Sequence, residues 1–262
     1  MTRSTTTAPF VFGHRGASLE RPENTLESFA LAVELGVTHL ESDVHMTRDG
    51  VLVVAHDPDG VRMANVDREI RACTYDEIAR WDAGHGFLDA SGARPFAQKG
   101  LVVPRLIDVV DAFPGVPLNL DMKQTEPSLV APLVELLRRS GAAERTVLAS
   151  FSGANLARAR ALSFEGGLAL SRTEIALAAF APRAAARIGI SSSTKRRAQV
   201  PLRAGPFTLA TEGFVARCRA LDVAVDYWTV NDAETARALV ARGADGIMTD
   251  DPRVVVPAVR GA

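Results

Sequence analysis

The residues best suited to chemistry in this sequence stand at the ends of apolar runs between positions 13 and 57. They form the segments G-H-R-G-A at 13–17, P-E-N-T at 22–25, E-S-D-V-H at 41–45 and A-H-D at 55–57. In the third segment Glu41, Asp43 and His45 alternate with less polar residues. Because strand side chains point to opposite faces with a period of two, these three groups share one face. Carboxylates on a buried face repel each other unless positive charge lies between them, so we expect a divalent cation there.

A second alternating run carries a third carboxylate. In residues 117–123, Asn119, Asp121 and Lys123 alternate with apolar side chains. Glu41, Asp43 and Asp121 together offer hard oxygen ligands, which suit Mg²⁺ or Ca²⁺. Two cysteines and the absence of an H-E-x-x-H motif argue against a zinc site of the protease type. The alternative for Glu41 and Asp43 is a structural ion pair with an arginine.

Positive side chains and histidines complete the set. Arg15 and Lys123 would add two fixed charges beside the cation, which favours an anion such as phosphate, whose reactions need charge stabilised in the transition state. His14 and His56 each precede a charged residue at a strand end. Imidazole titrates near neutral pH, so we predict that these two histidines act as acid and base.

Alternating strand and helix patterns must position these residues. The pattern predicts eight strands, at residues 10–16, 38–46, 117–123, 146–151, 167–171, 198–202, 224–231 and 246–249. Helical patterns cover residues 24–35, 105–113, 128–140, 155–162, 174–180, 211–221 and 233–241. An Asp-Gly pair at 49–50 predicts a hairpin that joins the second strand to residues 51–56. Without a G-x-G-x-x-G motif after the first strand, this order favours the α/β class and a (β/α)₈ TIM barrel, whose active sites lie at the C-terminal ends of the strands.

Length and charge restrict the class further. We expect one domain over residues 1–262, with an insertion at 58–103 after the second strand and its hairpin. Thirty basic against 31 acidic residues give no basic field, so nucleic acid is not an expected partner. The sequence shows neither an apolar signal segment nor a membrane span, which predicts a cytoplasmic protein without stable membrane insertion. The run Lys195-Arg196-Arg197 is expected to be a solvated loop.

Seven segments resemble the glycerophosphodiester phosphodiesterase family. They read G-H-R-G-A, P-E-N-T, E-S-D-V, A-H-D, N-L-D-M-K, V-D-Y-W-T-V-N-D and G-A-D-G-I-M-T-D-D-P, in this order between residues 13 and 252. The resemblance implies a metal-dependent (β/α)₈ hydrolase of lipid and glycerol metabolism. Such an enzyme cleaves a small-molecule glycerophosphodiester to glycerol 3-phosphate and an alcohol.

Site residues follow from the resemblance by position. It implies that His14 and His56 are the acid and base, that Arg15 and Lys123 bind the phosphate, and that the metal ligands are the three carboxylates Glu41, Asp43 and Asp121. The family usually has N-x-E-x-K where this chain has Asn119-Leu120-Asp121-Met122-Lys123. We therefore expect Asp121 to reach the metal less closely than a glutamate, or to bind it through water.

Trp228 and Asn231 are the remaining candidates, at the end of the seventh predicted strand. We expect both to bind substrate, Trp228 as a wall for the glycerol or alcohol group. The alternatives are that Trp228 covers the core and that Asn231 caps the following helix. Two rival functions also stand: a related phospholipase C or D type of phosphodiesterase acting on another head group, and a non-catalytic barrel that binds glycerol phosphates. The sequence does not decide the oligomeric state.

Overall fold

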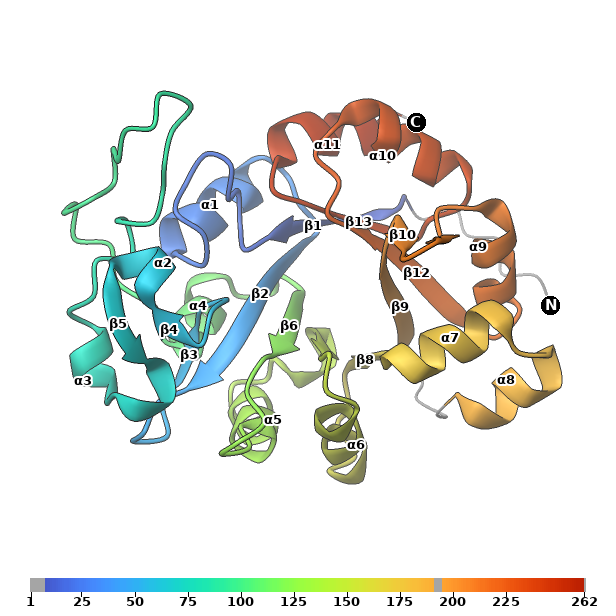
Figure 1. Ribbon diagram of the computed structural model, residues 1–262, viewed down its shortest axis with the longest axis horizontal. Helices are drawn as coiled ribbons and strands as arrows, with labels where there is room; N and C mark the ends of the chain where they lie inside the picture. The colour runs from blue at the N-terminus through green and yellow to red at the C-terminus, as the bar shows by residue number, and fades with distance from the viewer. Residues whose placement is uncertain (1–7, 191–194, 262) are drawn as a thin grey trace.

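A closed barrel of parallel strands forms the centre of the protein. The computed structural model describes residues 8–190 and 195–261. Within them, eight parallel strands pair in the order β1 (Phe10–His14), β2 (His39–Met46), β6 (Leu118–Met122), β7 (Thr146–Ala149), β8 (Gly167–Ala169), β9 (Arg196–Pro201), β12 (Val223–Trp228) and β13 (Gly246–Thr249). β13 pairs in turn with β1, from Gly246 beside Phe10 to Thr249 beside Gly13, and so closes the barrel (Figure 1). The predicted (β/α)₈ fold is confirmed.

Helices surround the barrel and bury its outer face. They are α1 (Leu26–Glu34), α4 (Leu106–Ala112), α5 (Val130–Arg139), α6 (Gly153–Ala161), α7 (Arg172–Phe180), α8 (Arg183–Gly189), α9 (Glu212–Arg219), α10 (Ala233–Ala241) and α11 (Pro252–Arg260). The main hydrophobic core joins strand residues such as Leu40 and Leu120 with helix residues such as Leu133 and Leu239. Among the described helices, none combines the length and apolar character that crossing a membrane requires.

Short polar residues fix where many of these helices begin. The side chain at each N-cap accepts a hydrogen bond from a backbone N–H in the first helical turn, at Thr25, Ser152, Ser171, Thr211, Asp232 and Asp251. Such caps satisfy donors that have no partner inside the helix. Ser152, Ser171, Asp232 and Asp251 come within a few residues of the C-terminal ends of β7, β8, β12 and β13, so these caps keep the loops at the barrel mouth short.

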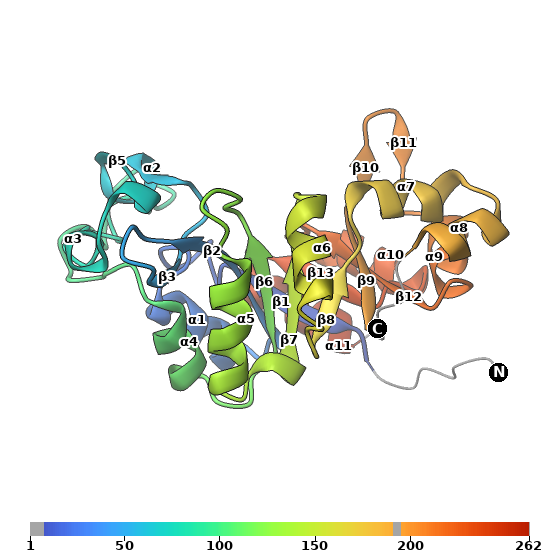
Figure 2. The ribbon, with the colours of Figure 1, turned by 90° about the horizontal axis from the view of Figure 1, so that it is seen from below.

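The second strand continues into a hairpin and then into smaller elements. β3 (Leu52–Val54) pairs antiparallel with β2, which confirms the hairpin predicted at Asp49 and Gly50. Residues 58–103, the predicted insertion, contain β4 (Asp59–Gly60), α2 (Val61–Ala64), β5 (Val66–Glu69), the 3₁₀ helix η1 (Ile70–Ala72) and α3 (Tyr75–Ile78). They share a separate hydrophobic cluster that includes Ile70, Ile78 and Trp81. Figure 2 shows α2 and β5 on the same side of the barrel as the hairpin of β10 (Arg203–Ala204) and β11 (Phe207–Thr208).

The expectation of a solvated loop at Lys195-Arg196-Arg197 was wrong for Arg196 and Arg197, whereas Lys195 is exposed and precedes the strand. Arg196 and Arg197 begin β9, and the guanidinium of Arg197 forms an ion pair inside the barrel with Asp226 of β12. Its Nε donates to Asp226 Oδ2 at 2.6 Å, and its charge lies 5.0 Å from the centre of the Phe10 ring. Asp226 supplies the opposite charge that a buried guanidinium requires, and this partner is distant in the sequence.

Candidate active site

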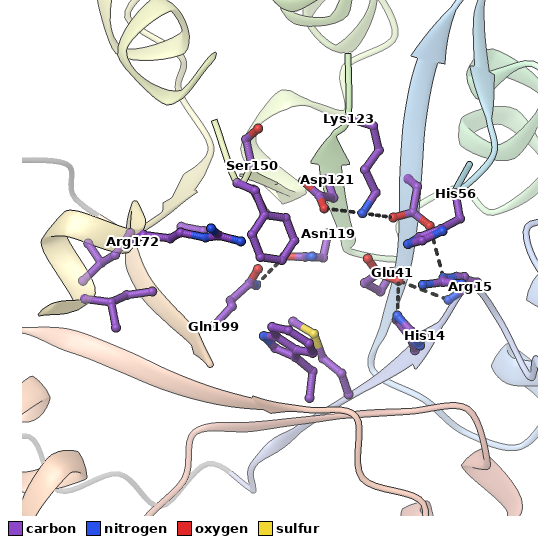
Figure 3. Close-up of a pocket in the computed structure, with 18 residues that line it drawn as sticks. His14, Arg15, Glu41, His56, Asn119, Asp121, Lys123, Ser150, Arg172 and Gln199 are labelled. Carbon is purple, nitrogen blue, oxygen red and sulfur yellow. Dashed lines mark hydrogen bonds and ion pairs between the residues drawn. The ribbon is translucent and has the colours of Figure 1, made fainter. Parts of the chain in front are cut away.

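A cavity of about 190 Å³ opens at the C-terminal ends of the barrel strands. All of the predicted site residues except Asn231 line it: His14, Arg15, Glu41, Asp43, His56, Asp121, Lys123 and Trp228. Other residues of its wall include Asn119, Ser150, Phe151, Arg172 and Gln199. Figure 3 shows His14, Arg15, Glu41 and His56 together on one side of the cavity, with Arg172 and Gln199 across from them. The cavity therefore has the position at which TIM barrels carry their active sites.

Neighbouring strands bring the three carboxylates together. Glu41 and Asp43 of β2 both line the cavity, and Asp121 stands beside Asp43 in the pairing of β2 with β6. All three residues are buried. Burial, followed by the negative charge of Asp43, raises the pKa of Glu41 to about 7. Burial also raises the pKa of Asp121. The site thus holds more negative charge than its surroundings stabilise.

Two cations neutralise the central carboxylate. Lys123 Nζ lies 3.0 Å from Asp43 Oδ1 and 2.7 Å from Asp121 Oδ2, and Arg15 Nε lies 3.2 Å from Asp43 Oδ2. Burial by itself would raise the pKa of Asp43, but Lys123 and Arg15 hold it below its usual value. Asn24 adds a hydrogen bond from its Nδ2 to Asp43 Oδ2 at 3.2 Å. Asp43 is therefore ionised and held in place from several sides.

A tight turn after β1 aims Arg15 into the cavity. Arg15 has a φ of 57° and Gly16 a φ of 91°, so the chain reverses immediately after the strand. A Cβ atom on Gly16 would lie 2.3 Å from Ser28 Oγ, which explains the glycine at this position. The backbone N–H of Arg15 donates to Glu41 Oε2 at 3.1 Å. The G-H-R-G segment thereby fixes both its own arginine and the first carboxylate of β2.

Each of the two histidines in the cavity is held by a carboxylate through its Nδ1 atom. His14 Nδ1 lies 2.6 Å from Asp250 Oδ1, and His56 Nδ1 lies 2.7 Å from Asp57 Oδ1. This arrangement orients the ring and leaves Nε2 for proton transfer. Burial lowers the pKa of His14, but Glu41 and Asp250 outweigh that effect, so the net pKa is raised. The sequence interpretation did not identify Asp57 or Asp250 as site residues.

Asn231 lies behind the site and does not line the cavity. Its Nδ2 donates to Asp250 Oδ2 at 2.9 Å, while its Oδ1 accepts from the backbone N–H of Asp250 at 2.9 Å. Ser18 Oγ donates to Asp250 Oδ1 at 2.9 Å. In this structure Asn231 therefore supports the partner of His14. The alternative role of helix cap belongs to Asp232.

Aromatic and amide side chains form the rest of the wall. The rings of Phe151 and Trp228 meet edge to face with their centres 6.2 Å apart. The Arg172 guanidinium lies 4.9 Å from the centre of the Phe151 ring. Gln199 Nε2 donates to Asn119 Oδ1 at 2.6 Å, which joins β9 to β6 across the barrel. One part of the cavity is therefore lined by charged side chains, and another by aromatic rings and amides.

The chemistry of the carboxylates fits a divalent cation. Their oxygen atoms are hard donors, and Asp121 Oδ1 is buried with no hydrogen-bond partner among the described residues. The raised pKa of Glu41 is a second sign of uncompensated charge. Within residues 8–190 and 195–261, no three or more histidine, cysteine or acidic side chains are placed so that together they could hold a metal ion. Lys123 Nζ lies between Asp43 and Asp121 instead.

Comparisons with known proteins identify the family of the chain. A sequence profile of the glycerophosphoryl diester phosphodiesterase family matches residues 14–254. The chain is 28% identical over 261 residues to a glycerophosphodiester phosphodiesterase of Caldanaerobacter subterraneus subsp. tengcongensis, which covers 95% of this chain and 97% of that protein.

Solved structures show the same fold. The chain resembles the glycerophosphoryl diester phosphodiesterase domain of a Mycobacterium tuberculosis protein with a TM-score of 0.82 and 21% identity, over 98% of this chain and 100% of that domain. It also resembles a phosphodiesterase of Oleispira antarctica, solved in complex with the product sn-glycerol-3-phosphate. That comparison has a TM-score of 0.76 and 25% identity, over 97% of each chain.

Proposed function

The chain belongs to the glycerophosphoryl diester phosphodiesterase family, and from that premise we propose that it hydrolyses glycerophosphodiesters to glycerol 3-phosphate and an alcohol. One observation carries the proposal. Two histidines, each held by a carboxylate, share a single cavity with three acidic residues and two cations. This set suits displacement at a phosphodiester, which needs an acid, a base and positive charge around the phosphoryl oxygens.

Arg15 and Lys123 bind the phosphate in the proposed reaction. Both cations line the cavity, and each forms an ion pair with Asp43, which also lines it. Opposing charges hold the two side chains in place before substrate enters, so little ordering remains to be done on binding. A guanidinium and an ammonium near the phosphoryl oxygens stabilise the charge that develops there.

His14 and His56 transfer the protons. In the proposed assignment His56 takes a proton from water, whose oxygen forms the new bond to phosphorus. His14 gives a proton to the alcohol oxygen as its bond to phosphorus breaks, so glycerol 3-phosphate and the free alcohol leave. The raised pKa of His14 supports its role as the acid, because the ring stays protonated closer to neutral pH. Asp57 and Asp250 keep both rings oriented.

The three carboxylates would hold a divalent cation, Mg²⁺ or Ca²⁺. Glu41, Asp43 and Asp121 are its proposed ligands, because they supply the oxygen donors and the excess negative charge. When bound, the cation supplies Lewis-acid stabilisation of the phosphoryl oxygens. Asp121 is the ligand whose second oxygen has no protein partner among the described residues, so a cation would satisfy it.

A second candidate is hydrolysis of a diester that carries a long alkyl chain. Exposed aromatic rings favour it: Phe151 is 54% exposed at the cavity wall, and Phe180 and Phe207 are 60% and 52% exposed. The rings of Phe180 and Phe207 lie 4.8 Å apart, between α7 and the β10–β11 hairpin. Exposed apolar surface of this kind is suited to contact with an alkyl chain. Faster turnover of lysophosphatidylcholine than of glycerophosphocholine, lost in Phe207→Ser, would establish this activity.

Assay of a panel of glycerophosphodiesters tests the main proposal. Glycerophosphocholine, glycerophosphoethanolamine and glycerophosphoglycerol should each release glycerol 3-phosphate, with and without chelator as the comparison. His14→Ala and His56→Ala should each lower kcat by roughly 10²- to 10⁴-fold with an unchanged circular dichroism spectrum. His85→Ala is the matched control, because His85 lies in the insertion and outside the cavity wall. A histidine variant that keeps more than about a tenth of kcat would remove that residue from its role.

A further inference from the structure

Arg62 connects the insertion with two carboxylates of the barrel mouth. It lies in α2, and its Nε donates to Asp57 Oδ2 at 2.6 Å. Its two terminal nitrogens donate to Glu23 at 2.7 and 2.8 Å. A planar guanidinium that forks between two carboxylates in this way fixes the position of both.

Each of those carboxylates also holds a residue of the cavity. The other oxygen of Asp57 lies 2.7 Å from His56 Nδ1. Glu23 accepts from Arg15 at 3.3 Å through each of its oxygens. A continuous chain of hydrogen bonds and ion pairs therefore runs from His56 through Asp57, Arg62 and Glu23 to Arg15.

Arg62 itself does not line the cavity, so any effect it has on the reaction passes through its two partners. We propose that Arg62 is a positioning residue, which sets the ring of His56 through Asp57 and the guanidinium of Arg15 through Glu23. The insertion thereby takes part in building the active site. This inference rests on the proposed function, because it assigns His56 to proton transfer and Arg15 to phosphate binding.

The contacts of Arg62 through Asp57 to His56 and through Glu23 to Arg15 predict separable kinetic effects. Asp57→Asn should lower kcat, because it acts on the proton-transferring histidine. Glu23→Gln should mainly raise KM, because it acts on the phosphate-binding arginine. Arg62→Gln should do both and lower kcat/KM for glycerophosphocholine by about 10- to 100-fold, as loss of an orienting partner does at other sites. Arg62→Lys should lie between parent and Arg62→Gln, since an ammonium restores the charge without the fork.

Arg68 provides the matched control. It lies in β5 of the same insertion, its side chain is 46% exposed against 49% for Arg62, and it forms its ion pair with Glu77. Arg68→Gln should leave kcat and KM within twofold of the parent. In the double variants, Arg62→Gln should add little to the KM effect of Glu23→Gln or to the kcat effect of Asp57→Asn, because each pair acts along one path. If the effects of the two single substitutions multiply in either double variant, the proposal is overturned.

A measurement without substrate separates this inference from the proposed function. The imidazole nitrogen signals of His56 in NMR should report a hydrogen-bonded Nδ1 in the parent and in Arg68→Gln, and a shifted, weakened one in Arg62→Gln. If the parent hydrolyses no glycerophosphodiester, the proposed function fails, yet this spectrum still decides whether Arg62 sets His56. Unchanged signals in Arg62→Gln, or kcat and KM within twofold of Arg68→Gln, would refute the positioning role. Should Arg62→Gln lose its fold, Arg62→Lys serves for the same comparison.

Discussion

The pairing of His14 with Asp250 gives the sharpest test of the acid assigned to the reaction. The two side chains are 17% and 25% exposed, and their contact is 2.6 Å long. Asp250→Asn keeps the shape of the side chain but removes the charge that orients and stabilises the protonated ring. A hydrogen bond to a charged group contributes about 1.5 to 3 kcal/mol. If that contribution is felt fully in the transition state, kcat should fall about 10- to 150-fold.

The pH dependence of kcat/KM in the same variant is an independent test of this role. Asp250 is one of the groups that raise the pKa of His14, so its loss should lower that pKa. His14 must be protonated to act as the acid, and the high-pH limb of kcat/KM follows its deprotonation. In Asp250→Asn this limb should therefore move to lower pH.

Asp251→Asn is the control for Asp250→Asn. Asp251 is the next residue, but its carboxylate caps α11 by accepting from Val254 N at 3.2 Å. Asparagine is an equally good cap, so stability and activity should both persist. Steady-state kinetics from pH 5 to 10 on both variants decide the matter. A kcat within twofold of the parent in Asp250→Asn, or a high-pH limb that stays in place or moves upward, would refute the role given to this pair.

Three further predictions concern the metal site and His39, the first residue of β2. Exhaustive chelation should abolish hydrolysis and Mg²⁺ or Ca²⁺ should restore it; full activity after chelation and dialysis would contradict metal dependence. Asp121→Asn should weaken metal binding in calorimetry while Asp121→Glu retains activity; unchanged affinity in Asp121→Asn would leave Asp121 as a partner of Lys123 only. Burial, with the charge of Arg197, lowers the pKa of His39 from 6.5 to about 4. Because only the unfolded state then binds a proton between these pH values, acidification from pH 6.5 to 4 should lower the free energy of unfolding of the parent by about 3 kcal/mol more than that of His39→Gln. Urea titrations at several pH values measure this difference, and an equal pH dependence of the unfolding free energy in the two proteins would exclude it.

The barrel was predictable because its strands follow a simple rule. Inward-facing polar residues alternate with outward-facing apolar ones at Glu41 and Asp43 and again at Asn119 and Asp121, and strand pairing follows from chain order. Elements that depend on tertiary packing were missed. α11 was not predicted, since Pro257 lies inside it and weakens the helical signal. α8 and the β10–β11 hairpin were also missed.

The site was predictable where its residues lie on barrel strands and not where they support each other from a distance. His14, Glu41 and Asp121 follow from their strands alone. Asp250 is 236 residues away from His14, and their contact depends on the closure of the barrel between β1 and β13. Arg62 reaches the site from an insertion whose path the sequence pattern does not determine.

The direction of the Asn231 side chain was also not predictable from the sequence, although Asn231 is only three residues beyond the end of β12. It was expected beside Trp228 on one strand, but β12 ends at Trp228. Past that point the chain turns Asn231 toward Asp250. Strand periodicity no longer applies there, so the direction of the side chain was not available from the pattern.

Hydrolysis of glycerophosphocholine in H₂¹⁸O, with the products identified by ³¹P NMR and mass spectrometry, tests the central claim most directly. Attack of water on phosphorus, with His14 protonating the departing alcohol oxygen, should give glycerol 3-phosphate that carries the label and choline that does not. His85→Ala should give the same products at the parental rate, and His14→Ala should give almost none. Release of phosphocholine and glycerol, label in choline, or no turnover with either metal would contradict the proposed reaction.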